Sequence, residues 1–514
     1  MVSPLSWATA GLLLLAAAPP TPWRPPDPPG PYSRLRPDDL KAVRSFARTD
    51  RVVGTYFFYW YDVHSGAHFV NRDGTDALVD HPADVGDYSY LSEAWWRKEM
   101  RDVRAAGIDF ITPVYWGVPG DYGGWSFRGL PPLVRAWDAM AAAGEDPPRV
   151  GLFYDTSTLR HGPGGQAVDL STEEGKLWFY ATIRDFFSLI PPRLWAAVEG
   201  KPVVFLYSAA FAAKQDPELF PFVRARFLED FGCEPYIVRE VSWRGDTDAL
   251  YAWGGALRPQ LYSVSSVGPG YDHHAVPGRT PLVVDREGGA FYRRSWEVLL
   301  ARKLERRATM VMVETWNELH EGTDICETKE YGRQYIELTA EYVKRFKAGE
   351  VVPHPSPFTG APEVSLAFDT PDGARGVQLR PGGDGLFEDA NLGGRPCRRT
   401  LPNPHGTTCY LYFDVDDGFL WDEDGVTVEV TLDYWATGVP AILVHYDHVD
   451  PARSVREGAF APGPAIPVAR PGEWQTATFR LEGCRFANRG NGGDFRLAVS
   501  GGELAVARVV VRRR

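Results

Sequence analysis

Apolar residues along positions 50–346 follow two different periods in turn. Short runs of β-branched and aromatic residues predict strands, and stretches with apolar residues three or four apart predict helices. The predicted strands are residues 52–61, 108–116, 149–154, 202–207, 236–241, 260–264, 281–284 and 310–313. The predicted helices are residues 133–143, 177–189 and 220–231, with further helical faces around Trp96, Met100 and Val103, around Trp296, Leu299, Leu300 and Leu304, and around Tyr335, Leu338, Tyr342 and Phe346.

The alternation of strands and helices predicts a parallel sheet. Eight predicted strands within about 300 residues are typical of a (β/α)8 TIM barrel with insertions. The fifth and sixth units have weak helical patterns, and a doubly wound open sheet is the alternative architecture. No G-x-G-x-x-G sequence follows the first predicted strand, so a nucleotide-binding fold has no support.

The pattern changes at residues 352–357, which read Val-Pro-His-Pro-Ser-Pro. Beyond this point helical spacing disappears, and short alternating runs separated by Gly and Pro predict strands. We therefore expect an α/β barrel domain over residues 36–350 and an all-β sandwich or jelly-roll domain over residues 360–514. Two roles are open for the second domain, which are carbohydrate binding and bracing of the barrel. Its predicted strands are residues 426–432, 441–446, 475–481, 495–499 and 505–511.

The N-terminal segment has the composition of an export signal. Residues 1–18 are almost wholly apolar and end in three Ala residues, which resembles a secretory signal peptide with a small-residue cleavage site. The segment has no Lys or Arg at its start, and its apolar run is too short to span a membrane. Residues 19–35 are rich in Pro and predict an extended linker. We expect a secreted or periplasmic protein without an integral membrane span.

Charge and cysteine content narrow the class of partner. The 514 residues carry a formal net charge of −12, which argues against nucleic acid or an anionic membrane as the main partner. The five Cys include no C-x-x-C pair and no Cys/His cluster at zinc spacing, so no metal or other cofactor is expected. In an exported protein, Cys397 and Cys409 are the pair expected to form a disulfide. Cys233, Cys326 and Cys484 are expected to be buried thiols.

Aromatic and polar side chains recur where the predicted strands end. In a TIM barrel the carboxyl ends of all strands meet at one face, and active sites form there. We therefore expect a cleft lined by side chains from most of the strands. The candidates for substrate binding at these ends are Tyr59, Trp60, Tyr61, Asp62, Trp116, Asp155, Tyr271, Asp272, Arg286, Trp316, Asn317 and His320.

The richest strand end follows the last predicted strand of the barrel and spans residues 314–321. Here Glu318 and Glu321 are three residues apart, which places both carboxylates on one face of a turn or of a first helical turn. Cleavage of a glycosidic bond needs two carboxyl groups, one to protonate the leaving oxygen and one to act as base or nucleophile. The alternative is an acidic cluster on a surface loop, although Trp316 and His320 are unusual residues for a solvated loop.

The segment Asn317-Glu318-Leu319-His320-Glu321-Gly322-Thr323 resembles the N-E-W-H-E-G-T signature of glycoside hydrolase family 99, with Leu319 in place of the usual Trp. The resemblance implies a (β/α)8 barrel with endo-acting α-mannosidase or α-mannanase activity. It also adds Tyr292 to the candidates for substrate binding. The segments similar to other motifs of that family are residues 54–61, 269–272 and 285–292, and the whole resemblance covers residues 50–345.

The family resemblance also implies roles for the two carboxylates. Glu318 would act as a base on the 2-hydroxyl of the substrate, which displaces the leaving group through a 1,2-anhydro sugar. Glu321 would be the general acid and then the base. The residues alone fit ordinary retention through a glycosyl-enzyme equally well, with carboxyl groups about 5 Å apart. In either route Glu321 must hold a proton, and we expect nearby Glu318 and Trp316 to favour this. His320 is expected to point away from both carboxylates.

Two other polar segments are weaker candidates for metal sites. Asp272, His273 and His274 follow one another in the sequence, but adjacent His residues rarely bind one ion together. The acidic residues at 414–417 and 422–424 lack the Gly and Glu positions of an EF-hand loop. A structural calcium ion and a solvated acidic loop both stay open for these residues.

The sequence therefore predicts a secreted glycoside hydrolase with Glu318 and Glu321 as its catalytic pair and a carbohydrate as its partner. By the family resemblance, the substrate is an α-mannoside or another sugar with an axial 2-hydroxyl group, cleaved with retention of configuration. The alternative is a non-catalytic carbohydrate-binding protein on a hydrolase-like barrel. A polysaccharide esterase is disfavoured because the chain lacks a G-x-S-x-G sequence.

Overall fold

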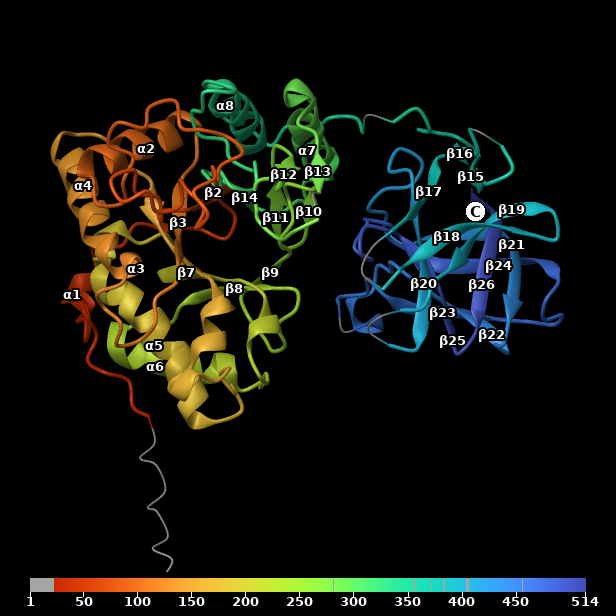
Figure 1. The fold of residues 1–514 in the computed structure, drawn as a ribbon, viewed down its shortest axis with the longest axis horizontal. Coiled ribbons are helices and arrows are strands. Elements are labelled where there is room, and N and C mark those ends of the chain that lie inside the picture. The colour runs from red at the N-terminus through yellow and green to blue at the C-terminus, as the bar shows by residue number, and fades with distance from the viewer. Residues whose placement is uncertain are drawn as a thin grey trace, which may run out of the picture.

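The computed structural model describes residues 23–280, 282–354, 356–370, 372–381, 384–403, 406–454 and 456–514. Figure 1 shows a mixed α/β lobe and an all-β lobe lying side by side. The chain passes from the first lobe to the second between α8 (Gln334–Lys347) and β15 (Glu363–Ala367). The predicted signal peptide at residues 1–18 and the first residues of the Pro-rich linker lie outside the described residues.

The first lobe is built on a parallel barrel, as the alternating pattern predicts. Its eight strand positions follow in the order β9, β8, β7, β5, β3, β2, β14 and β11, and each neighbouring pair in this order is parallel. β4 (Arg149–Val150) pairs with β3 just before β5 and belongs to the same position. The bounds are β2 Val52–Phe57, β3 Phe110–Tyr115, β5 Leu152–Tyr154, β7 Lys201–Leu206, β8 Tyr236–Glu240, β9 Ala249–Tyr251, β11 Val264–Val267 and β14 Met310–Val313.

Helices cover the barrel on most of its circumference. Residues 241–263, all of which are described, contain no helix between β8 and β11. This agrees with the weak helical patterns of the fifth and sixth units in the sequence. In the described part of the chain, no helix combines the length and apolar character that crossing a bilayer requires. Besides α8, the helices are α1 Pro37–Leu40, α2 Glu93–Ala105, α3 Trp125–Arg128, α4 Leu130–Ala142, α5 Glu173–Leu189, α6 Leu219–Phe231 and α7 Ala290–Ala301.

Two of the predicted barrel strands are wrong. The sixth position is β9, whereas the segment predicted at 260–264 supplies β10 (Gln260–Leu261), which forms an antiparallel hairpin with β11. The segment predicted at 281–284 supplies β13 (Val283–Val284), which pairs with β12 (Tyr271–Asp272) outside the barrel. Val283 is 56% exposed, so this apolar run belongs to a surface hairpin and not to a core strand.

The barrel closes between β9 and β11 without a backbone ladder among the described residues. A side chain bridges the gap instead. The hydroxyl of Ser263 accepts a hydrogen bond from the Leu250 N–H at 2.7 Å and donates one to the Leu250 carbonyl at 3.0 Å. The junction of the sixth and seventh positions therefore depends on one hydroxyl where other strand pairs have regular ladders.

Aromatic rings fill much of the barrel interior. The ring centroid of Tyr56 in β2 lies 4.7 Å from that of Phe153 in β5 and 5.8 Å from that of Phe205 in β7. The ring of Phe205 lies 5.3 Å from that of Tyr251 in β9. Large rings bury a large apolar area each, so part of the high aromatic content stabilises the core.

The second lobe is a sandwich of two antiparallel sheets, as predicted. Its core lies between the sheets and is rich in Val, Leu and Phe. The seven-stranded sheet contains β15 with β16 Ala374–Arg375, β18 Phe387–Leu392, β19 Arg395–Thr400, β21 Val426–Thr437, β24 Trp474–Cys484 and β26 Glu503–Arg513. The five-stranded sheet contains β17 Val377–Arg380, β20 Thr408–Val415, β22 Ala441–Tyr446, β23 Ala461–Pro467 and β25 Phe495–Ser500.

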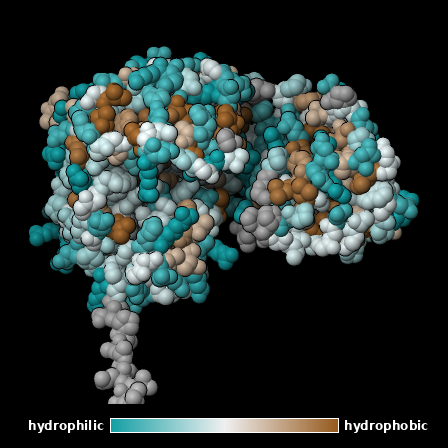
Figure 2. Space-filling model, viewed as in Figure 1, coloured by the Kyte–Doolittle hydropathy of each residue, from teal (hydrophilic) through white to brown (hydrophobic). Residues whose placement is uncertain are grey.

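A buried ion pair joins the two lobes. Arg302, which follows α7, is 2% exposed, and its Nε donates to Oδ2 of Asp422 at 2.7 Å. The other carboxylate oxygen of Asp422 accepts from Nε of Arg485 in the second lobe at 2.6 Å. The face of the two lobes that Figure 2 shows is mainly hydrophilic, with hydrophobic residues scattered in small groups. The contact between the lobes thus contains a carboxylate held by one arginine from each lobe.

The predicted disulfide between Cys397 and Cys409 is wrong, because both residues are free thiols in the structure. Cys397 lies in β19 of the seven-stranded sheet, and Cys409 lies in β20 of the five-stranded sheet. The Cys397 side chain packs with Ala505 and Ala507, whereas Cys409 packs against the core between the sheets. The two side chains therefore belong to different clusters.

Candidate active site

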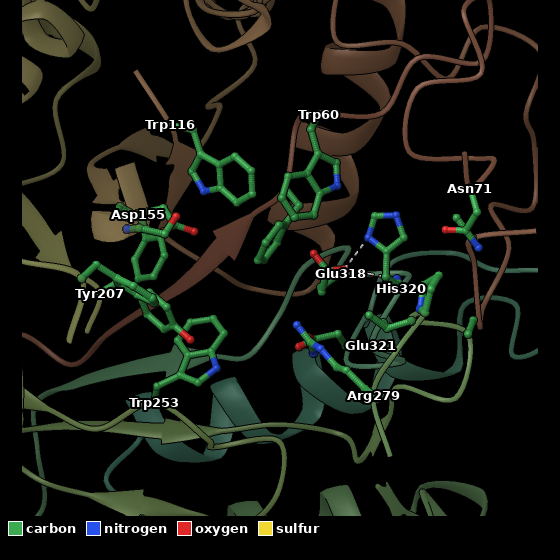
Figure 3. A pocket seen from close by; sticks show the side chains of 18 of the residues that line it. Trp60, Asn71, Trp116, Asp155, Tyr207, Trp253, Arg279, Glu318, His320 and Glu321 are labelled. Carbon is green, nitrogen blue, oxygen red and sulfur yellow. Dashed lines mark hydrogen bonds and ion pairs between the residues drawn. The ribbon is translucent and has the colours of Figure 1, made fainter. Parts of the chain in front are cut away.

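A cavity of about 480 Å³ opens at the carboxyl ends of the barrel strands. Figure 3 shows its two sides, with Glu318, His320, Glu321 and Arg279 on one and Asp155 on the other. As predicted, both members of the Glu pair line one cleft. The lining residues are Phe58, Trp60, Asn71, Ala77, Trp116, Phe153, Asp155, Ser157, Arg160, Tyr207, Phe211, Trp253, Ala275, Val276, Pro277, Arg279, Glu318, His320 and Glu321.

Glu318 is held in a tight turn after β14. Its backbone N–H donates to Oγ1 of Thr315 at 2.9 Å, and that hydroxyl lies 3.1 Å from the hydroxyl of Thr323. The Glu318 side chain is 4% exposed, and its Oε1 accepts from the backbone N–H of His320 at 3.2 Å. Its Oε2 is buried and has no hydrogen-bond partner in the described part of the chain. One carboxylate oxygen is therefore fixed, and the other is free for a ligand.

His320 points toward Glu318, so the expectation that it points away is wrong. Its Nδ1 lies 2.8 Å from Oε1 of Glu318, and its Nε2 lies 2.9 Å from the carbonyl oxygen of His68. A carbonyl only accepts, so Nε2 carries a hydrogen and any proton between Nδ1 and Oε1 is shared by the pair. Burial raises the pKa of Glu318, against the lowering influence of His320. Burial lowers the pKa of His320, but the Glu318 carboxylate outweighs it and the net direction is upward.

Glu321 is more open to solvent than Glu318 and is ion-paired. The Nη1 of Arg279 donates to Oε1 of Glu321 at 2.6 Å, and the two side chains meet at the cavity in Figure 3. Arg279 belongs to the hairpin between β12 and β13, where residues 275–277 also line the cavity. A ligand that approaches Glu321 therefore meets this hairpin first.

The other side of the cavity carries a further buried carboxylate. Asp155 follows β5, and its Oδ1 accepts a hydrogen bond from the N–H of Ser157 at 3.0 Å. Burial is the main cause of the raised pKa of Asp155. Trp116, Tyr207 and Trp253 lie on the same side of the cavity in Figure 3. This side combines flat apolar rings with a hydrogen-bonding group, as sugar rings require.

Several buried polar atoms of the cavity residues have no partner within the described part of the chain. They are Nε1 of Trp60, Nε1 of Trp116 and Oε2 of Glu318, that is, two donors and one acceptor. Buried polar groups are normally satisfied, and those left over in a cavity are commonly satisfied by a ligand or by water. A hydroxyl group both donates and accepts, so a ligand rich in hydroxyls suits this mixture.

His68 contacts both Trp60, through its ring, and His320, through its backbone carbonyl. The rings of Trp60 and His68 stack with centroids 4.4 Å apart and an interplanar angle of 1°. Burial, and then the charge of His320, lower the pKa of His68 to about 4. His68 is thus neutral at ordinary pH, which suits its position against an apolar indole face.

Arg286 does not line this cavity. It is 7% exposed and pairs with Asp80 at 2.7 Å and with Asp324 at 3.1 Å. Its Nη2 donates to the carbonyl of Gly322 at 3.0 Å, and its Nη1 donates to the carbonyl of Asp324 at 2.9 Å. The guanidinium also lies 4.5 Å from the ring centroid of Tyr331. Arg286 therefore holds the loop that carries the Glu pair from its buried side, outside the cavity.

Five other candidate residues make buried contacts elsewhere and do not line the cavity. Trp316 donates from Nε1 to Glu99 of α2 at 2.7 Å, so the expected proximity of its indole to Glu321 is wrong. Asn317 exchanges two hydrogen bonds with the backbone of Phe58, at 2.7 and 2.8 Å. The remaining buried contacts are Tyr59 OH to the Ser126 carbonyl, Leu319 N–H to Tyr61 OH, and Tyr292 OH with Thr339 Oγ1.

The last three candidates also lie outside the wall of the cavity. Asp62 accepts from the N–H of Ser65 at 3.2 Å and stabilises a turn. Tyr271 and Asp272 form β12 and line a separate cavity of about 140 Å³. Within the described residues, no group of three or more His, Cys, Asp or Glu side chains is arranged to hold a metal ion.

Sequence reasoning missed several residues of the cavity. Tyr207 is the last residue of the strand predicted at 202–207 and directly follows β7, which was an available signal, and Trp253 follows the unpredicted β9. Arg160 lies in a short 3-10 helix at Thr156–His161, and Arg279 lies in the hairpin between β12 and β13. Neither segment has a regular hydrophobic pattern in the sequence. Glu314, which directly follows β14 and does not line the cavity, is 1% exposed and accepts from the Gly254 N–H at 2.9 Å. Burial raises the pKa of Glu314 to about 8.

A family model described as "Domain of unknown function (DUF5010)" matches residues 53–356. No curated protein sequence is detectably similar to the chain. The GH99 endo-alpha-mannosidase from Bacteroides thetaiotaomicron is similar in structure, with a TM-score of 0.41, 18% identity, and coverage of 59% of this chain and 100% of that chain. The isomalto-dextranase of Arthrobacter globiformis T6 has a TM-score of 0.34, 10% identity, and coverage of 91% of this chain and 98% of that chain. The first of these is from the family that the sequence motifs resemble.

Proposed function

The chain belongs to the family described as Domain of unknown function (DUF5010), and from this premise we propose that it is a glycoside hydrolase acting on a polysaccharide or glycan. One observation carries the proposal. Glu318 and Glu321 line the same cavity at the carboxyl end of β14, and one buried oxygen of Glu318 has no hydrogen-bond partner among the described residues. Two carboxyl groups that flank a cleft are the usual means of cleaving a glycosidic bond.

In the proposed reaction Glu318 is the base and Glu321 is the general acid. The free Oε2 of Glu318 takes the proton of a substrate hydroxyl, while His320 keeps the other oxygen in place. Glu321 protonates the leaving oxygen after Arg279 has moved from its ion pair. Glu321 then acts as the base that activates water. This assignment of roles follows the resemblance to family 99.

The proposed substrate is an α-mannoside or a related sugar with an axial 2-hydroxyl. A mannoside has that hydroxyl beside the anomeric carbon, where a base can direct it to displace the leaving group. Ordinary retention through a covalent glycosyl-enzyme uses the same pair of carboxylates. A 2-deoxy substrate separates the two routes, because it lacks the displacing hydroxyl and supports only the covalent route.

The test is a screen of the purified full chain against neutral and acidic polysaccharides, with α-mannans included and products analysed by mass spectrometry. The proposal expects oligosaccharide products from at least one substrate, and none from the variant carrying both Glu318→Gln and Glu321→Gln. Binding of a polysaccharide without any product would favour the non-catalytic alternative. Equal turnover by the double variant would place the chemistry elsewhere.

A further inference from the structure

The all-β lobe has a cavity of its own. It measures about 330 Å³ and shares no lining residue with the catalytic cavity. The cavity lies on the outer face of the five-stranded sheet. Its residues Tyr410 in β20 and Arg496 in β25 point to that face, because their neighbours Leu411 and Leu497 point into the core of the sandwich and side chains alternate along a strand. The lining residues are Asp384, Tyr410, Ser454, Arg456, Phe460, Asn491 and Arg496.

Arg496 is held rigidly in this cavity. Its guanidinium carbon lies 4.1 Å from the ring centroid of Tyr410 and 4.3 Å from that of Phe460. Its Nη1 donates to the hydroxyl of Tyr412 at 2.7 Å, and its Nε donates to Nδ1 of His445 at 3.3 Å. Nη2 makes no hydrogen bond within the described residues. The protein thus orients one side of the guanidinium and leaves donors on the other.

A hydrogen-bond network fixes the surroundings of Arg496. The Tyr412 hydroxyl accepts from Arg496 and from Nδ2 of Asn491 at 3.1 Å, and donates to Oδ1 of Asp384 at 2.7 Å. These three bonds use the one hydrogen and both lone pairs of the hydroxyl. Because the network is complete without a ligand, the cavity is organised before anything binds, which lowers the entropy cost of binding.

The cavity has an excess of positive charge in an acidic protein. Arg456, over the ring of Phe460 at 5.3 Å, is the second arginine of the wall. Neither Arg456 nor Arg496 forms an ion pair with any described carboxylate. Asp384, the acidic member of the wall, is hydrogen-bonded to Tyr412. The chain as a whole carries a net charge of −12, so two unpaired arginines at one cavity are not explained by the general composition.

We propose that this cavity binds an acidic sugar unit, with the sugar carboxylate on Arg456 and Arg496. Guanidinium groups recognise carboxylates through paired charge-assisted hydrogen bonds. The half-buried rings of Tyr410 and Phe460 offer apolar surface to the C–H groups of a sugar ring, and Ser454 and Asn491 offer partners for its hydroxyls. A small inorganic anion would use the arginines but not the aromatic walls.

The cavity is a separate attachment site and not an extension of the catalytic cleft. Arg302 pairs with Asp422 of the second lobe and donates from Nη1 to the carbonyl of Leu261, which precedes β11, so the lobes meet near the amino end of that strand. The catalytic cavity lies at the opposite, carboxyl ends. An acidic chain held on the second lobe would therefore tether the protein to a polymer. The proposal does not depend on hydrolase activity in the barrel.

The test is isothermal titration calorimetry on the full chain with tetramers of galacturonate, glucuronate and mannuronate. Neutral tetramers of galactose, glucose and mannose, and inorganic phosphate, are the comparison ligands. The variants are Arg456→Gln, which changes an exposed side chain, and Arg456→Gln with Arg496→Gln. The matched control is Arg480→Gln, an exposed arginine of β24 in the other sheet. Thermal unfolding verifies that each variant is folded.

The proposal expects one acidic tetramer to bind about tenfold or more tightly than its neutral counterpart, a difference worth about 1.4 kcal/mol. Arg456→Gln should weaken this binding, the double variant should abolish it, and Arg480→Gln should leave it unchanged. The proposal is overturned if no acidic tetramer binds, if neutral tetramers bind equally well, or if phosphate alone binds as tightly. Unchanged binding by a folded Arg456→Gln variant would also overturn it.

Discussion

The Nδ1 atom of His320 lies 2.8 Å from Oε1 of Glu318, while the Nε2 atom of the same ring lies 2.9 Å from the carbonyl oxygen of His68. The carbonyl fixes the tautomer, so His320 acts on Glu318 through a single nitrogen. The pair shares whatever proton lies between them, and its two titrations are linked. This contact gives the proposed base a neighbour that controls its charge.

Replacement of His320 by Phe should move the acid limb of the pH–activity profile to higher pH. The base must be ionised, so activity falls as pH drops through the pKa of Glu318, which burial already raises. His320 lowers that pKa, and its removal lets the pKa rise further. The measurement is kcat/KM from pH 4 to 9 on a substrate found in the screen (roughly the range in which His and Glu titrate).

The control for this prediction is His64→Phe. His64 pairs with Asp87 on the surface, where both side chains are more than half exposed, and it does not line the cavity. Its replacement should leave the profile unchanged. An acid limb that stays in place in His320→Phe would mean that His320 does not influence the proposed base.

Glu318→Gln and Glu321→Gln should each lower turnover by about 10²- to 10⁴-fold, because each amide keeps the shape of the side chain but cannot transfer the proton. The two variants should differ with an activated substrate. A nitrophenyl glycoside needs little protonation of its leaving group, so it should restore the first chemical step in Glu321→Gln and not in Glu318→Gln. Burst-phase kinetics measures that step. Rescue of Glu318→Gln alone would mean that the two roles are reversed.

Arg286→Met should lower the stability of the barrel by about 3–5 kcal/mol, the usual cost of removing one partner from a buried ion pair. The change leaves Asp80 and Asp324 buried without their counter-charge. It should also lower kcat, because the carbonyl of Gly322 loses its donor next to Glu321. Urea unfolding followed by tryptophan fluorescence measures the first effect, and steady-state kinetics measures the second.

A matched change at the surface is available for comparison. Arg294→Met removes an ion pair with Glu287 in which both side chains are about half exposed, at 47% and 49%. Exposed pairs contribute little to stability, so this variant should unfold at nearly the same urea concentration as the parent chain. Equal loss of stability in the two variants would show that the Arg286 contacts have no special importance.

A fragment of residues 33–350 should unfold cooperatively, but at a lower temperature than the barrel within the full chain. The sequence predicts that the barrel is a domain with its own core. The structure adds that Arg302 loses its buried partner Asp422 in the fragment. Differential scanning calorimetry on the fragment and on the full chain measures the difference. A fragment without a cooperative transition would show that the barrel depends on the second lobe.

The fold was predictable wherever local pattern and burial agree. Strands such as β2 and β14 are apolar and wholly buried, and α5 repeats its apolar residues at helical spacing. Hydropathy alone misled at residues 281–284, because Leu282 and Val283 are apolar but 45% and 56% exposed. It also missed β9, whose three residues are too few to form a periodic pattern.

The candidate site was predictable only as far as its residues are close in the sequence. Glu318 and Glu321 belong to one turn, so their spacing was sufficient to place them in the same cleft. The direction of His320 depends on the backbone of that turn, which turns its ring back to the carboxylate two residues earlier. Arg279 reaches Glu321 across 42 positions of the chain from a hairpin, and no local pattern records such a contact.

Arg286 and Arg279 hold the loop of the Glu pair from opposite sides. The loop bearing the Glu pair is tied from the buried side, through the backbone carbonyls of Gly322 and Asp324. The hairpin bearing Arg279 approaches the same pair from the open side and forms part of the cavity wall. The outer hairpin can therefore change in sequence and reshape the cavity wall without displacing the two carboxylates, so variation of this hairpin alone would alter which glycans the proposed hydrolase accepts.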